Sequence, residues 1–209
     1  MEDSTLKAQK IADWLGSGSI NIFGRQFSGK DTQGRILADM FGGVLLGGGD
    51  IMRNSVIPPH VADAMKKGLL PPSKDYIEIV TPYLSKQEFA GHPLFLSAVG
   101  RWIGEEEGVL SAAAASGHPV KAVVYLDMPK ELSYKRWETF KAHDDRGDRN
   151  DESLESFETR LQEFENKTLP LMETYKKLGL LVSISADQPV ETVTNEILDQ
   201  LASLASASR

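Results

Sequence analysis

Short apolar runs alternate along the chain with longer segments in which apolar residues recur at helical spacing. The apolar runs predict strands at residues 20–23, 43–46, 94–99, 120–128 and 180–186. The segments around them predict helices at residues 5–15, 33–41, 51–55, 60–67, 73–89, 105–116, 130–142, 153–178 and 190–204. Continuously apolar strands that alternate with helices are typical of a parallel sheet covered on both faces. We therefore expect a three-layer α/β fold with a five-stranded parallel sheet.

The junction between the first predicted strand and the next helix carries a specific motif. Residues 24–32 read GRQFSGKDT, which is the pattern G-x-x-x-x-G-K-x-T. A strand that turns through glycines into a helix points backbone N–H groups at one spot, where the helix dipole favours an anion. The pattern predicts a P-loop fold in which Lys30 reaches the β- and γ-phosphates of a nucleotide and the Thr32 hydroxyl coordinates Mg²⁺. Asp31 is a second candidate for the metal, through a metal-bound water.

Composition narrows the class of protein. The chain has 209 residues, 41% of them hydrophobic and 25% charged, which suits one globular domain. It contains no cysteine, so disulfides, thiol catalysis and cysteine-ligated zinc are excluded. The net charge of −7 argues against a nucleic-acid surface, and no apolar run approaches the roughly 20 residues of a membrane span. Glu2 and Asp3 stand where a signal peptide would be positive, so we expect a cytoplasmic protein.

Six further elements follow the phosphate loop in order. They are Gly49-Asp50-x-x-Arg53, Gly100-Arg101, Arg149-x-Asp151, Arg160, Lys167-Thr168-x-Pro170-Leu171 and Gln188-Pro189-Val190. In this order and spacing, the chain from Ser19 to Leu201 resembles the adenylate kinase family of nucleoside monophosphate kinases, in its short-lid form. Any one element alone would be weak, and the agreement of seven in order makes the resemblance specific.

The resemblance implies a domain organisation and an activity. A helical extension (1–18) would precede the kinase domain (19–204), which would contain an acceptor-binding insertion at about 48–76 and a lid at about 139–152. Residues 205–209 would form a frayed tail. The implied activity is reversible transfer of the γ-phosphoryl group of Mg-ATP to AMP, giving two ADP. We expect a monomer whose partners are these nucleotides, with no nucleic acid or membrane partner and Mg²⁺ as the cofactor.

The resemblance also assigns roles to individual residues. Positive charge must gather around the migrating phosphoryl group, and the catalytic residues implied are Lys30, Arg101, Arg149 and Arg160. The ATP site is expected at Gly24, Phe27, Ser28, Gly29, Lys30, Asp31, Thr32, Arg136 and Gln188. The AMP site is expected at Gly48, Arg53, Gly68, Leu69, Leu70, Ala98, Arg101, Glu105, Arg149 and Arg160.

Several positions depart from the family pattern. Phe27 stands where the loop usually has a small residue, so its ring must point outward. Gly48 replaces a hydroxyl residue, and Phe140 replaces an arginine that touches phosphate. Ser97 replaces the strand-end aspartate that holds metal-bound waters, and Asp31 is expected to compensate. These changes leave the fold prediction intact and bear on the acceptor and on turnover.

Glu105 stands where a glutamine usually reads the adenine of the acceptor. A glutamate carboxylate can only accept hydrogen bonds, which suits the N–H groups of guanine better than adenine N1. A second interpretation is that Glu105 points to solvent at the start of a helix, where negative charge suits the dipole. We keep AMP as the expected acceptor. The alternatives are a kinase for GMP, CMP or UMP, and a nucleotide-binding protein with little turnover.

Overall fold

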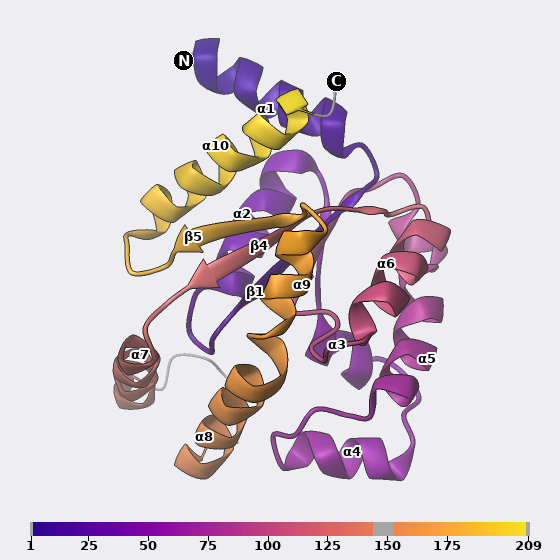
Figure 1. Ribbon diagram of the computed structural model, residues 1–209, viewed down its shortest axis with the longest axis vertical. Helices are drawn as coiled ribbons and strands as arrows, with labels where there is room; N and C mark the ends of the chain where they lie inside the picture. The colour runs from indigo at the N-terminus through magenta and orange to yellow at the C-terminus, as the bar shows by residue number, and fades with distance from the viewer. Residues whose placement is uncertain (1, 144–152, 208–209) are drawn as a thin grey trace.

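The computed structural model describes residues 2–143 and 153–207 (Figure 1). A five-stranded sheet runs through it in the order β2-β3-β1-β4-β5, and all neighbouring strands are parallel. The strands are β1 (Ser19–Gly24), β2 (Val44–Gly47), β3 (Leu94–Ser97), β4 (Val120–Asp127) and β5 (Leu181–Ser185). The expected α/β fold with a five-stranded parallel sheet is confirmed.

Helices cover both faces of this sheet. They are α1 (Glu2–Leu15), α2 (Lys30–Phe41), α3 (Gly48–Arg53), α4 (Pro59–Lys66), α5 (Ser73–Leu84), α6 (Glu105–Ala115), α7 (Lys130–His143), α8 (Leu154–Glu163), α9 (Leu171–Lys177) and α10 (Val190–Ala207), with a 3₁₀ turn η1 (Gln87–Phe89) and a π-helical turn η2 (Phe164–Thr168). None of the helices within the described ranges is long and apolar enough to cross a bilayer.

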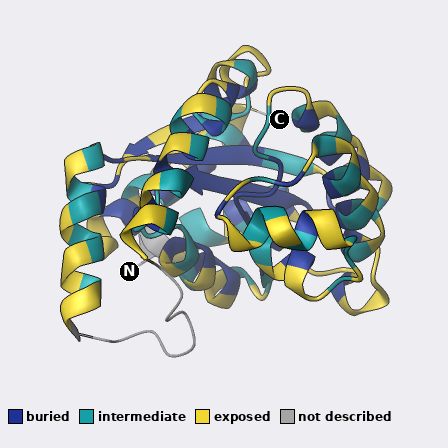
Figure 2. Cartoon of the chain, turned by 90° about the horizontal axis from the view of Figure 1, so that it is seen from below, coloured by how far each residue is buried: buried dark blue, intermediate teal, exposed yellow. Residues whose placement is uncertain are grey.

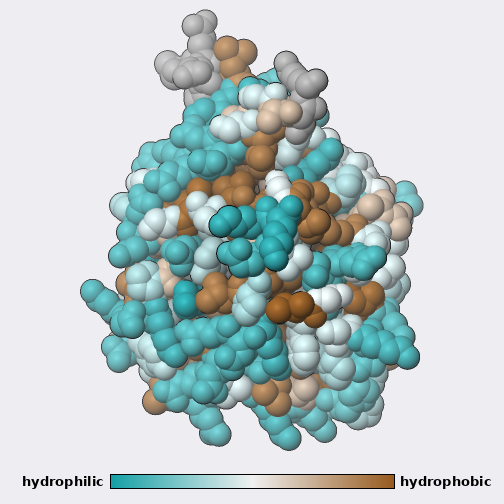
Figure 3. Space-filling model, viewed as in Figure 1, coloured by the Kyte–Doolittle hydropathy of each residue, from teal (hydrophilic) through white to brown (hydrophobic). Residues whose placement is uncertain are grey.

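The apolar strands are buried between two helical layers. In β1, Ile20 and Ile22 belong to a core cluster formed with α1, α2 and α10, while Phe23 belongs to a cluster formed with η2 and α9. A further cluster joins β2 and β3 to α3, α5 and α6. Figure 2 shows the strands as a buried centre with the exposed residues on the helices, and polar residues cover most of the face in Figure 3. Burial on both faces explains why these strands read as continuous apolar runs.

The two ends of the chain pack together (Figure 1). Ile11 of α1 is fully buried in the same cluster as Ile197 of α10, and Lys7 forms an ion pair with Asp199. The first helix is therefore part of the core. Helix α10 continues to Ala207 with Ala205 only 2% exposed, so the expectation of a frayed tail from residue 205 is wrong. Residues 208–209 lie outside the described part.

Two expected helices are interrupted. The helix expected over 73–89 ends at Leu84, and η1 follows so that Phe89 packs on Tyr83, 5.9 Å between ring centroids. The helix expected over 153–178 is divided by η2, where the N–H of Leu169 donates to the carbonyl of Phe164 at 2.8 Å. This bond spans five residues instead of four, and Pro170, which has no N–H, follows directly.

Candidate active site

A cavity of about 680 Å³ opens at the carboxyl ends of β1, β2 and β3. This edge is where parallel α/β sheets bind ligands. Most of the expected site residues line it: Gly24, Phe27, Lys30, Asp31, Gly48, Arg53, Gly68, Leu69, Leu70, Ala98, Arg101, Glu105 and Arg160. The fold therefore brings the phosphate loop and the expected acceptor residues to one cavity. Ser28, Gly29, Thr32, Arg136 and Gln188 are not in its lining, and Arg149 lies outside the described residues.

The phosphate loop has the backbone geometry that its glycines predict. At Gly24 a Cβ would lie 2.5 Å from the Ser28 hydroxyl oxygen, so only glycine fits the turn. Gly29 precedes α2 with a φ of 91°, in the left-handed region that favours glycine. Lys30 begins the helix, and its Nζ donates to the carbonyl of Arg25 at 2.9 Å. The lysine thus lies over the loop that would cradle phosphate.

Phe27 is the unusual residue of this loop. Its φ of 63° lies in the left-handed region, which a bulky side chain rarely occupies. Its ring packs on Phe140 of α7 and Phe157 of α8, at centroid distances of 5.6 Å and 5.8 Å. The ring therefore turns towards α7 and α8, as the sequence predicted for a side chain too large for the cradle. Phe140, which stands where the family resemblance implies an arginine, is part of this aromatic contact.

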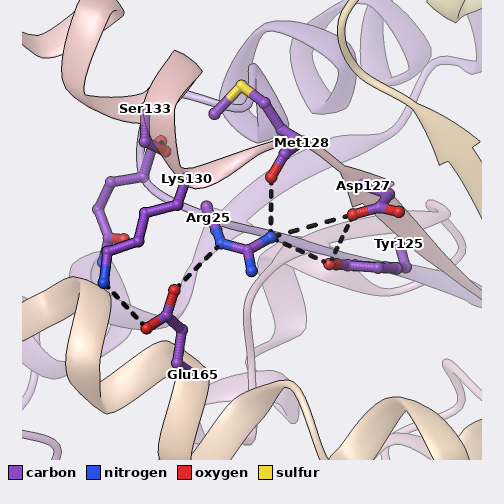
Figure 4. A network of polar contacts seen from close by, with 8 residues as sticks. Arg25, Tyr125, Asp127, Met128, Lys130, Ser133 and Glu165 are labelled. Atoms are coloured by element: carbon purple, nitrogen blue, oxygen red, sulfur yellow. Dashed lines mark hydrogen bonds and ion pairs between the residues drawn. The ribbon is translucent and has the colours of Figure 1, made fainter.

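Arg25 holds the loop from outside the cavity (Figure 4). Its Nη1 donates to the carbonyl of Met128 at 2.8 Å and lies 3.9 Å from Asp127 at the end of β4. Its Nε lies 3.7 Å from Glu165 of η2, which also binds Lys130 of α7 at 3.2 Å. Sequence reasoning assigned Arg25 no role, because its partners lie more than 100 residues away in the chain. Arg25 ties the phosphate loop to β4 and η2.

Arg136 and Gln188, both expected at the ATP site, bind the backbone of the fold. Arg136 donates to the carbonyls of Phe27 and Ala186, at 3.0 Å and 2.9 Å, and so joins the phosphate loop to the end of β5. Gln188 donates to the carbonyl of Ser185 at 3.1 Å. The structure thus places Arg136 next to the loop and gives it two backbone partners.

A carboxylate reaches the cavity from α2 instead of β3. Ser97, the last residue of β3, donates its hydroxyl hydrogen bond to Oδ1 of Asp31 at 2.7 Å. Both residues line the cavity. The described residues contain no group of three or more His, Asp or Glu that could hold a metal alone. The oxygen of Asp31 suits Mg²⁺, which takes few protein ligands and completes its shell with water and phosphate oxygens.

The far wall of the cavity is the turn between β3 and α6. Ala98 has a φ of 53°, which ends the strand expected over 94–99 at Ser97. Asn21 of β1 clamps the turn, since its Nδ2 donates to the Val99 carbonyl at 2.7 Å and its Oδ1 accepts from the Val99 N–H at 3.2 Å. The Arg101 side chain donates to the Ala98 carbonyl at 3.2 Å. Hydrogen bonds from Asn21 and from Arg101 itself therefore hold the turn that carries Arg101.

Arg101 lies in a partly buried, charged setting. Burial lowers the pKa of its guanidinium, while Tyr76 and Asp31 act in the opposite direction and Arg160 adds to the lowering. A guanidinium remains charged at neutral pH even so, because its ordinary pKa lies far above 7. Arg101 thus keeps its positive charge in the cavity, near both Asp31 and Arg160.

Glu105 is buried, only 2% exposed, so the interpretation that it points to solvent is wrong. Its Oε2 accepts from the N–H groups of Arg101 and Trp102, at 2.6 Å and 3.0 Å. Its Oε1 is buried and has no hydrogen-bond partner among the described residues. One carboxylate oxygen therefore holds the turn of Arg101, and the other is unused.

Helix α8 closes the cavity against the segment 48–76. Glu163 accepts from the Leu70 N–H at 3.0 Å and from Lys167 Nζ at 2.6 Å. A Cβ on Gly68 would lie 3.4 Å from Cγ of Arg160, so Arg160 packs closely on this segment. Sequence reasoning missed Glu163, whose role depends on a backbone N–H 93 residues away.

Arg53 of α3 is more exposed than Arg101. It lines the cavity and forms an ion pair with Asp50 at 2.5 Å. About half of each side chain remains accessible, so this pair contributes little to stability.

The sequence is similar to curated adenylate kinases. It is 32% identical over 184 residues to an adenylate kinase of Prochlorococcus marinus (strain MIT 9515), a match that covers 84% of this chain and 93% of that protein. It is 27% identical over 209 residues to an adenylate kinase of Caldicellulosiruptor saccharolyticus, covering 86% and 97% of the two chains. No protein-family model matches the chain.

The fold is similar to that of a gluconokinase from Sinorhizobium meliloti 1021, with a TM-score of 0.61. The match covers 91% of this chain and 94% of the gluconokinase, at 20% sequence identity. At that identity the likeness shows the fold alone, which is that of a P-loop kinase.

Proposed function

The chain belongs to the adenylate kinase family of nucleoside monophosphate kinases, and we propose that it transfers the γ-phosphoryl group of Mg-ATP reversibly to AMP, giving two ADP. The observation that carries this proposal is that the phosphate loop and Arg101 line the same cavity. Phosphoryl transfer requires two nucleotides held in line, little water and positive charge at the migrating group. A single cavity with a phosphate loop on one side and guanidinium groups on the other suits that chemistry.

Each charged residue has a distinct part in the proposed reaction. Lys30 binds the β- and γ-phosphates and follows the charge that develops on the transferred group. Arg101 binds the phosphate of the acceptor, since its guanidinium can form two parallel hydrogen bonds to phosphate oxygens. Arg160 approaches from α8, and Arg149 completes the set from the lid. We propose the segment 48–76 as the acceptor-binding insertion and 139–152 as this lid.

Mg²⁺ fits the oxygen groups at the start of α2. The Thr32 hydroxyl would bind the ion directly, and the Asp31 carboxylate would bind it through water. The Ser97 hydroxyl, which donates to Oδ1 of Asp31 at 2.7 Å, would hold that carboxylate in place. When bound, the ion neutralises phosphate charge. Asp31 would therefore supply the carboxylate that the family usually has at the end of the strand, where this chain has Ser97.

The second candidate function is a kinase for another nucleoside monophosphate, and Glu105 is the observation that favours it. Its buried carboxylate accepts hydrogen bonds only, as guanine N–H groups require. A binding protein with little turnover is less well supported, because Lys30, Arg101 and Arg160 all line the cavity.

A coupled assay of ADP formation from Mg-ATP and each of AMP, GMP, CMP and UMP tests these alternatives. We expect the highest kcat/KM with AMP. A higher kcat/KM with GMP would favour the second candidate. Tight ATP binding without turnover of any monophosphate would leave the binding-protein interpretation.

A further inference from the structure

Two side chains from different helices meet at the far wall of the cavity. Tyr76 lies on α5 and Glu105 begins α6, and the two helices pack side by side (Figure 1). The Tyr76 hydroxyl accepts from the Gly100 N–H at 3.2 Å, while Glu105 accepts from the N–H groups of Arg101 and Trp102. These three N–H groups are consecutive, and the phenol and the carboxylate lie close enough to interact electrostatically. Both residues line the cavity.

Each of these groups has unused hydrogen-bonding capacity. The Tyr76 oxygen accepts from Gly100, and in the described part of the chain nothing accepts its proton. Burial raises the pKa of Tyr76 to about 12, so the phenol keeps that proton at neutral pH. Glu105 Oε1 is buried and has no donor within the described ranges. Buried polar groups are nearly always paired, so an unpaired donor and acceptor in one cavity wall point to a ligand.

Gly48 of α3 leaves the space that the Tyr76 hydroxyl occupies. A Cβ at Gly48 would lie 2.9 Å from that hydroxyl and 2.6 Å from the Ala98 carbonyl. A side chain at position 48 would displace one or the other. The phenol therefore occupies space at the cavity wall that α3 leaves open.

We propose that Tyr76 and Glu105 together read the base of the acceptor nucleotide: the Tyr76 hydroxyl donates to N1 of adenine, and Oε1 of Glu105 accepts from the neighbouring 6-amino group. This inference rests on the proposed function and deepens it. One donor beside one acceptor offers adenine what a single amide would offer, although Glu105 alone cannot donate. The pair removes the repulsion between a lone carboxylate and adenine N1.

The first experiment compares AMP with 1-deaza-AMP, in which N1 is replaced by C–H. The variant Tyr76→Phe should raise KM for AMP about tenfold with little change in kcat, the usual size of one lost hydrogen bond. Its KM for 1-deaza-AMP should equal that of the wild type, since that base cannot accept the bond. Tyr83→Phe, on the same helix but outside the cavity lining, is the matched control.

The second experiment replaces the acceptor with a donor. In Glu105→Gln the amide oxygen can take over the two backbone N–H groups, which leaves the NH₂ group where Oε1 lay. The ratio of kcat/KM for AMP to that for IMP, which has a 6-oxo group, should fall about tenfold or more. Glu106→Gln is the control, because Glu106 accepts from the Gly104 N–H and lies outside the cavity lining.

The outcomes separate this inference from the proposed function. If the wild type prefers GMP, CMP or UMP to AMP, both are wrong. If it prefers AMP, but Tyr76→Phe weakens AMP and 1-deaza-AMP equally, the tyrosine is structural and the inference alone is wrong. An unchanged AMP to IMP ratio in Glu105→Gln would also overturn it. Calorimetric AMP binding to the wild type, against 1-deaza-AMP and the 6-deamino analogue, should show a loss for each and needs no variant to fold.

Discussion

The two ends of the cavity are built in different ways. The phosphate-loop end comes from one continuous segment, residues 24–32, whose backbone does most of the proposed binding. The proposed acceptor end gathers residues from three separate parts of the chain, which are Gly48, Tyr76 and the turn that contains Arg101 and Glu105. The first can be recognised by its spacing, whereas the second exists only once the sheet and its helices have packed. Substitutions at the acceptor end must therefore be interpreted together.

The ends also differ in how departures from the family pattern are absorbed. In the phosphate loop, Phe27 keeps a left-handed backbone and turns its ring into an aromatic contact with α7 and α8. At the acceptor end, the space beside Gly48 is filled by the hydroxyl of Tyr76. One change is absorbed by neighbouring packing, and the other changes which polar groups face the ligand.

The largest expected effect is at the phosphate-loop end. Lys30→Ala should lower kcat by about a hundredfold or more, because a charge contact used in the transition state is lost. The circular dichroism spectrum should be unchanged, and Lys177→Ala, on the exposed surface of α9, should keep full activity. Near-wild-type turnover in folded Lys30→Ala would show that the loop is not the catalytic phosphate site.

The Asp31–Ser97 pair gives the next largest effect. Asp31→Asn should lower kcat by roughly tenfold or more and raise the Mg²⁺ concentration needed for ATP binding, since the carboxylate is lost. Ser97→Ala removes only a hydrogen bond to that carboxylate and should cost less than tenfold.

The exchange variant D31S/S97D returns the carboxylate to β3 and keeps a hydroxyl beside it. It should recover most of the Mg²⁺-dependent ATP binding that Asp31→Asn loses, as measured by calorimetry. If Asp31→Asn binds Mg-ATP like the wild type, Asp31 has no part in holding the metal.

Gly48→Ala tests whether the two ends are independent. Its Cβ must displace the Ala98 carbonyl or the Tyr76 hydroxyl, so KM for AMP should rise several-fold while KM for ATP stays the same. The free energy of unfolding should fall by about 1–3 kcal/mol, the usual effect of overpacking. Initial rates with each nucleotide varied in turn, and urea unfolding, measure these quantities. Equal changes in both KM values would show that the ends are coupled.

The smallest effect is confined to alkaline pH. Burial raises the pKa of both Tyr76 and Tyr125 to about 12, from an ordinary value of 10.0. Below pH 10 the phenols keep their protons in both the folded and the unfolded protein, so their contribution to the free energy of unfolding is fully present. As pH rises from 10 towards 12, the unfolded state loses protons first, so the free energy of unfolding falls by at most about 1.4 kcal/mol per pH unit for each tyrosine.

The variant Tyr125→Phe isolates the contribution at the phosphate-loop end, and Tyr76→Phe isolates the one at the acceptor end. Urea unfolding at pH 9 and pH 11 should show a smaller loss of stability in each variant than in the wild type. An identical loss in Tyr125→Phe would mean that its hydroxyl is not buried in the folded protein.

The amino-acid sequence by itself determined the five parallel strands, the phosphate loop and its lysine. These follow from local causes, because a strand buried on both faces must be apolar and a phosphate turn needs glycines at fixed spacing. The spacing of the motifs also singled out Arg53, Arg101 and Arg160, and the structure places all three at one cavity. The catalytic roles of these residues, including Arg149, stay predictions.

Only the tertiary structure decided how distant residues pair. The contact between Asp31 and Ser97 joins positions 66 residues apart. Tyr76 and Glu105 line the same side of the cavity because α5 and α6 pack together. No periodicity encodes such contacts. The π-helical turn at Phe164–Thr168, which buries Phe164 in a core cluster with Phe23 of β1, was not predicted from the sequence either. A hydrogen bond between remote segments depends on distances in space, and these are settled when burial of the apolar faces fixes the packing of the sheet and helices.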